Sequence, residues 1–158
     1  MFSSQSLQAV VRPGELAVRE LRLDAAVRLL DVRGTLDATT AGGLARRIDA
    51  AAATGVRWLV VDIGATVAVT DDALAMLVDA GRSLRARSAE LIVAGGPGDA
   101  AERLAAFDVA HRPVQADSVD QVIVLLRQLG AGVRGARPVP RARRRVESLM
   151  LPRIQPRA

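Results

Sequence analysis

The chain has 158 residues, a formal net charge of +5, no Cys and a single His, His111. The absence of Cys excludes disulfides and thiolate metal sites, and a lone His leaves no partner for a His-based metal cluster. All 22 basic residues are Arg, which excludes chemistry that needs a Lys. No segment reaches the roughly 18 apolar residues of a membrane span. We therefore expect a soluble, cytoplasmic protein in which His111 is a solvated loop residue.

The positive charge is concentrated at the C-terminal end of the chain. Residues 1–130 carry 14 Arg and 16 acidic residues, whereas residues 131–158 carry 8 Arg and one acidic residue. Residues 1–14 lack periodicity, and the C-terminal stretch is rich in Gly, Pro and Arg. We predict a flexible lead-in at residues 1–14, one domain at residues 15–130 and a basic, disordered tail at residues 131–158. The tail is either simply solvated or binds nucleic acid, anionic lipid or an acidic partner weakly through its charge.

The predicted domain begins with a β-hairpin and continues into a helix. Residues 16–23 and 27–33 are two strand-like runs separated by a short turn. Thr39 or Thr40 is the expected N-cap of the following helix, which stops near Thr54-Gly55. One face of that helix carries the apolar residues Ala41, Leu44, Ala45, Ile48, Ala51 and Ala52.

The centre of the chain holds a buried strand and an amphipathic helix. Residues 57–63 form a continuous apolar run rich in branched side chains, which is typical of a strand buried on both faces. We expect residues 64–69 to be a short connection to a helix capped by Thr70. Asp71 and Asp72 fall in its first turn, where the helix dipole favours negative charge. The apolar positions of this helix follow the helical period: Leu74, Leu77, Val78, Gly81 and Leu84.

The remaining segments continue the alternation of strands and helices. They are a buried strand at residues 90–94, a short helix capped by Asp99, an edge strand at residues 112–115 and a helix from the capping box Ser118–Gln121 to about Gly130. Phe107 and Val109 are expected to pack beneath the short helix. The order β-β-α-β-α-β-α-β-α predicts an α/β fold, a mostly parallel mixed β-sheet with an opening β-hairpin and four helices.

Several polar segments follow the ends of the predicted strands. Loops at the carboxyl ends of parallel strands share one rim, where α/β proteins place their sites. The carboxylates of Asp37, Asp62, Asp71 and Asp72 fall there, but a Mg²⁺ pocket for phosphoryl transfer would also need a Lys. We favour helix caps and dipole partners for them, and expect no metal, no cofactor and no enzymatic activity. The Gly95–Gly98 loop leaves a nucleotide- or Mg-binding domain as an alternative, although it matches neither the dinucleotide fingerprint nor the P-loop.

Three runs of sequence carry a family resemblance. Residues 31–41 contain a Gly-x-Leu-Asp motif from Gly34 to Asp37, residues 58–62 end in an apolar-Asp pair, and residues 69–74 include the start of the central helix. Together they resemble the STAS domain (sulphate transporter and anti-sigma factor antagonist). The resemblance covers roughly residues 16–129 and includes the order of the elements.

The resemblance implies a protein-interaction module in transcriptional or stress signalling. Family members of the anti-sigma factor antagonist type bind a kinase that also holds a sigma factor. They use the start of the central helix, where the first Ser of an Asp-Ser-Ser-Gly-Leu motif is phosphorylated. The resemblance therefore implies an anti-sigma factor or kinase-like regulator as the partner, bound through Asp37, Thr70, Asp71, Asp72 and Leu74. A STAS subunit of a transport complex is the alternative that the family's breadth leaves open.

The matching motif here is Thr70-Asp71-Asp72-Ala73-Leu74, so Asp71 stands at the phosphosite-equivalent position. An aspartate carries a charge of −1, whereas a phosphoserine carries about −1.5 to −2. Either the chain is locked in the released form that phosphorylation produces, or its partner is matched to the carboxylate. We favour the second hypothesis, because Asp72 adds negative charge that suits an Arg- or Lys-bearing partner. Thr66 and Thr70 are fallback phosphorylation sites.

The tail is predicted to be dispensable for folding. It lacks the apolar face needed to offset the roughly 1–2 kcal/mol of backbone entropy that each ordered residue costs. A chain shortened to residues 1–130 should therefore keep the melting temperature of the full-length protein in parallel calorimetric scans. A melting temperature lower by many degrees would show that residues 146–151 dock on the domain.

Overall fold

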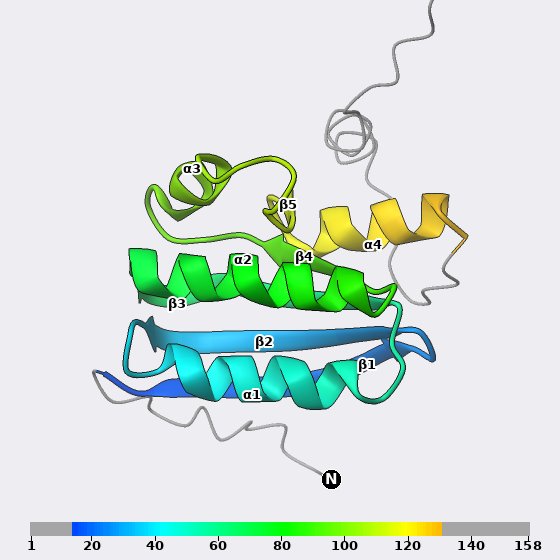
Figure 1. The fold of residues 1–158 in the computed structure, drawn as a ribbon, viewed down its shortest axis with the longest axis horizontal. Helices are drawn as coiled ribbons and strands as arrows, with labels where there is room; N and C mark the ends of the chain where they lie inside the picture. The colour runs from blue at the N-terminus through cyan, green and yellow to red at the C-terminus, as the bar shows by residue number, and fades with distance from the viewer. Residues whose placement is uncertain (1–13, 131–158) are drawn as a thin grey trace, which may run out of the picture.

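The computed structural model describes residues 14–130, which form one five-stranded sheet with helices on both faces (Figure 1). The strands are β1 (Leu16–Asp24), β2 (Val27–Leu36), β3 (Trp58–Val69), β4 (Glu90–Ala94) and β5 (Val114–Ala116). The helices are α1 (Ala41–Ala52), α2 (Asp71–Ala86), α3 (Ala100–Ala105) and α4 (Val119–Gln128). The predicted tail, and the predicted lead-in apart from Gly14, lie outside the described residues.

The strands lie in the order in which the chain makes them, β1-β2-β3-β4-β5. β1 pairs with β2 in the antiparallel sense, and every other neighbouring pair is parallel. The predicted fold class is therefore confirmed, with the opening hairpin at one edge and β5 at the other. None of the helices within residues 14–130 combines the length and apolar character that crossing a membrane demands.

Alternation along the strands builds two apolar layers, one on each face of the sheet. In β3, Leu59 and Val61 face the larger core, which α1, α2 and α3 cover, whereas Val60 faces the smaller core beneath α4. All three side chains are fully buried. Figure 1 shows α1 and α2 running side by side across the same face. The apolar run at residues 57–63 predicted a strand buried on both faces, and β3 is covered on both faces.

The connection predicted at residues 64–69 is wrong, because these residues continue β3. β2 also runs further than predicted, to Leu36, and gives the extension a parallel partner from Arg33↔Ala65 to Leu36↔Val69. Two register shifts in this part of the ladder accompany the loss of regular alternation. Among the described strands β2 alone pairs with the extension, since the pairing of β3 with β4 ends at Asp62↔Ala94.

The predicted N-cap residues stand at the starts of their helices, but not all of them make the expected side-chain hydrogen bond. Thr70 and Ser118 each cap a helix through the side-chain oxygen, as expected. Thr40 occupies the N-cap position of α1 and Asp99 that of α3, but neither side chain accepts a hydrogen bond from a backbone amide of its helix. The Gln121 side chain accepts from the Asp117 amide rather than from Ser118, so the capping box is incomplete.

The expectations for the segment around β5 are partly corrected. Phe107 packs against the larger core as predicted, but Val109 is 67% exposed. β5 begins at Val114, two residues later than predicted. Pro113 has no amide proton for a sheet hydrogen bond, and the carbonyl of Arg112 is bonded instead by the guanidinium of Arg85 at 2.7 Å.

Leu77 of α2 is fully buried in the larger core, so its truncation should leave a cavity. We predict that Leu77→Ala lowers the free energy of unfolding by about 2–5 kcal/mol in urea titrations. Leu129→Ala is the matched control, because Leu129 is 45% exposed and the same truncation should cost about 0.5 kcal/mol or less. Equal losses for the two variants would contradict the assigned core.

Candidate functional site

The starts of two helices lie together at the carboxyl ends of β2 and β3. Leu36 and Val69 are paired in the ladder, and the amide of Thr70 donates to the carbonyl of Leu36 at 3.0 Å. This bond fixes the entry to α1 beside the entry to α2. We call the polar residues gathered there, Asp37, Thr70, Asp71 and Asp72, the acidic rim.

The first turn of α2 is an exposed, negatively charged helix start. Thr70 has an extended backbone, and its hydroxyl oxygen accepts from the amide of Ala73 at 3.4 Å. Asp71 and Asp72 follow in the first turn, where the helix dipole stabilises carboxylates, and both are exposed. Leu74, predicted to bind the partner, is fully buried in the core and therefore positions the helix instead of meeting solvent.

Asp37 holds the loop that enters α1. One of its carboxylate oxygens accepts from the hydroxyl of Thr39 at 2.7 Å and from the amides of Thr39 and Thr40 at 2.9 and 3.1 Å. The hydrogen bond from the Thr39 hydroxyl is the main cause that lowers the pKa of Asp37 below its ordinary value, and the two amides act in the same direction. The charged form of Asp37 is thus the one that the loop stabilises.

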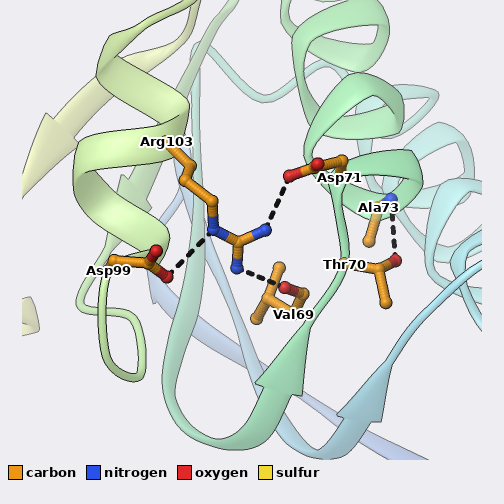
Figure 2. Close-up of polar contacts among 6 residues, drawn as sticks. All are labelled: Val69, Thr70, Asp71, Ala73, Asp99 and Arg103. Atoms are coloured by element: carbon orange, nitrogen blue, oxygen red, sulfur yellow. Dashed lines mark hydrogen bonds and ion pairs between the residues drawn. The ribbon is translucent and has the colours of Figure 1, made fainter.

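Asp71 forms an ion pair that the sequence did not predict. Arg103 of α3 donates from Nη1 to the Asp71 carboxylate at 2.7 Å and from Nε to Asp99 at 3.0 Å. Its Nη2 donates to the carbonyl of Val69, the last residue of β3 (Figure 2). The pair with Asp71 is the largest cause that raises the pKa of Arg103. The sequence carries one signal for part of this cluster: Asp99 and Arg103 are four residues apart on a predicted helix, a spacing that favours an ion pair between them.

Asp72 and Val67, which lie close in sequence to this ion pair, are both exposed. Asp72 forms no ion pair or side-chain hydrogen bond within residues 14–130, so its charge is uncompensated at short range. Val67, in the β3 extension three residues before Thr70, is 79% exposed and is the most exposed large hydrophobic residue of the described chain. Sequence reasoning missed Val67 because it assigned residues 64–69 to a connection.

Two other predicted residues lie away from the acidic rim. Asp62 sits where β4 ends, and its carboxylate accepts from the amide of Gly64 at 2.9 Å, so the β3 extension separates it from α2. Thr66 is 6% exposed, and its hydroxyl donates to the carbonyl of Ile63 at 2.6 Å. Within residues 14–130, no three Asp, Glu or His side chains lie close enough together to hold a metal ion.

The Gly95–Gly98 loop has a packing explanation. The backbone of Gly95 has φ of +72°, and a Cβ atom there would lie 2.8 Å from the Cα of Gly64. The loop therefore needs glycine for its conformation and for its close approach to β3. His111 is exposed as expected, with Nδ1 3.6 Å from the carboxylate of Asp108.

Comparison with known proteins adds a family and two related folds. A family model described as the STAS domain matches residues 19–122. The fold is similar to that of an anti-sigma factor antagonist from Mycobacterium paratuberculosis, with 22% identity and a TM-score of 0.63 over 75% of this chain and 99% of that chain. It is also similar to the anti-sigma factor antagonist SpoIIAA in its unphosphorylated form, with 13% identity and a TM-score of 0.56 over 74% and 100% of the two chains. No protein of curated function matches the sequence.

The lowered pKa of Asp37 predicts a pH-dependent contribution to stability. Because the folded pKa lies below the ordinary value of 3.8, this contribution is complete above that value and is lost as the pH falls through the folded pKa. Asp37→Ala should therefore lower the melting temperature near neutral pH, and its difference from the wild type should vanish in strong acid. Thr39→Val removes the main hydrogen-bond donor to Asp37, so the stability contributed by the ionised carboxylate should be lost at a higher pH than in the wild type. A difference that is independent of pH would contradict the role of the charge.

Proposed function

The chain belongs to the STAS domain family, and from that premise we propose that it acts as a protein-interaction module of the anti-sigma factor antagonist type. The partner is an anti-sigma factor or a kinase-like regulator, and it docks on the acidic rim and the adjacent Val67. The observation that carries this proposal is the first turn of α2, where two exposed carboxylates stand on a helix whose apolar face is buried, with the exposed Val67 three residues before its N-cap.

The chemistry of this surface suits a basic partner with an apolar contact. Val67 offers an apolar side chain, and its removal from water on contact with a partner is favourable. Asp72 offers a charge that steers and orients a surface rich in Arg or Lys. Leu74 contributes indirectly, since its burial holds α2 in place.

Asp71, at the phosphosite-equivalent position of the acidic rim, cannot be phosphorylated as a serine is. Asp71 has no hydroxyl group there, so its negative charge is permanent. Of the two fallback acceptors, Thr66 is buried and its hydroxyl is bonded, which leaves Thr70 as the accessible one. We propose that the module binds without reversible control at position 71, and that Thr70 is the one hydroxyl of the rim where a phosphate can be added.

The test is to capture the partner from the native host and to measure its affinity for variants with matched charge changes. Asp72→Arg reverses an exposed charge at the rim and should weaken binding by about tenfold or more, because a like charge then faces a basic partner. Asp49→Arg, the same change on an exposed position of α1, should leave the affinity within about twofold.

Circular dichroism would check that both variants fold. Equal affinity losses for Asp72→Arg and Asp49→Arg would show that only the net charge of the domain matters. Unchanged binding by Asp72→Arg would place the interface elsewhere on the domain.

A further inference from the structure

Arg103 joins three elements through a single guanidinium group. Each of its nitrogen atoms donates to a different acceptor: Nε to Asp99 at the start of α3, Nη1 to Asp71 at the start of α2, and Nη2 to the carbonyl of Val69 at the end of β3. The Arg103 side chain is 32% exposed, so the group lies in the junction between α2 and α3 (Figure 2). Planar guanidinium groups suit such multiple contacts, which a lysine ammonium could not match in geometry.

This contact makes two neighbouring aspartates unequal. The Asp71 carboxylate points toward Arg103 in Figure 2, and one of its oxygens is held at 2.7 Å. Asp72 has no cation beside it within the described chain. The Asp71 side chain is 84% exposed, so a partner can reach its second oxygen, but it can bond both oxygens only by displacing Arg103. Both oxygens of Asp72 are free for a partner within the described chain.

We propose that Arg103 is a specificity-determining residue of the rim: it retains Asp71 as an internal counter-ion, fastens the start of α3 to the start of α2, and leaves Asp72 as the charge that the partner reads. The inference rests on the proposed function for the partner's part in it. It extends the binding surface to α3 and assigns Asp71 a role within the fold, in place of the direct match between Asp71 and the partner that we favoured from the sequence.

We call the three contacts of Arg103 the clamp. Its ion pairs lie at the surface, so it should affect the junction between α2 and α3 more than the stability of the whole domain. Surface ion pairs add little to global stability, and Ala100 and Leu104 anchor α3 in the core independently. Loss of Arg103 should therefore loosen the junction while the fold persists. A six-residue helix is too short to be stable by itself, so α3 is sensitive to such an attachment.

Hydrogen exchange of the full-length protein alone tests the clamp without a partner. Arg103→Gln and Asp71→Asn should each speed amide exchange at residues 70–75 and 100–105 by about two- to fivefold, the factor that an exposed ion pair of this kind contributes. The double variant should exchange no faster than the faster single variant, because both remove the same interaction. The difference from the wild type should shrink at about 1 M salt, which screens exposed charges.

Asp72→Asn is the matched control, since it removes the same charge from the same helix turn without breaking an ion pair. It should leave exchange at residues 100–105 unchanged. The clamp is refuted if Asp72→Asn speeds exchange there as much as Asp71→Asn does, or if Arg103→Gln leaves both segments unaffected.

Affinity for the captured partner tests the specificity. Arg103→Gln and Asp71→Asn should weaken binding by similar factors that do not multiply in the double variant, whereas the factor for Asp72→Asn should multiply with either. Stronger binding by Arg103→Gln would overturn the specificity assignment, because it would show that the partner reads a released Asp71. A partner indifferent to all three variants would refute both the specificity role and the proposed rim, while the exchange result would still decide whether the clamp exists.

Discussion

The parallel pairing of β2 with β3 is the constraint on which the rest of the site depends. It extends past the end of β4 to Leu36 and Val69, and the bond from the Thr70 amide to the Leu36 carbonyl closes it. Because both strands end together, the entries to α1 and α2 stand at one edge. The leucines of α2 are buried in the core on the same sheet and hold the helix in place there. The site is thus a consequence of strand register and core packing.

The carboxylates of the acidic rim differ in the polar groups that they contact. Asp37 is committed to the loop before α1, and Asp71 is committed to Arg103. Asp72 alone among the rim carboxylates has no such partner in the described chain. Proximity in sequence therefore says little about role, since neighbouring aspartates with the same chemistry are used for different purposes. Within the described chain this leaves Asp72 as the one unpaired carboxylate of the rim, five residues after the exposed Val67.

Local sequence signals predicted much of the fold and part of the site. Thr70 caps α2 through Ala73, as its residue type and position indicated, and the apolar run that ends at Ile63 is a buried strand. Residues 64–69 were misassigned because their alternation is irregular and their strand partner is distant in sequence. The Arg103–Asp71 pair spans 32 residues and depends on where α3 packs, so no local pattern could predict it. The helical period already placed Leu74 on the apolar face of α2, against the partner-binding role that the resemblance implied, whereas the exposure of Val67 could not be predicted from the sequence.

We propose that a partner covers the surface formed by the β3 extension, the start of α2 and the start of α3. A hydrogen-exchange footprint of the captured complex, compared with the free protein, measures this surface directly. We expect protection to be concentrated at residues 65–75 and 99–105, with β1 and α4 unchanged. Protection confined to β1, α4 or β5, with no change at the start of α2, would show that the partner binds elsewhere.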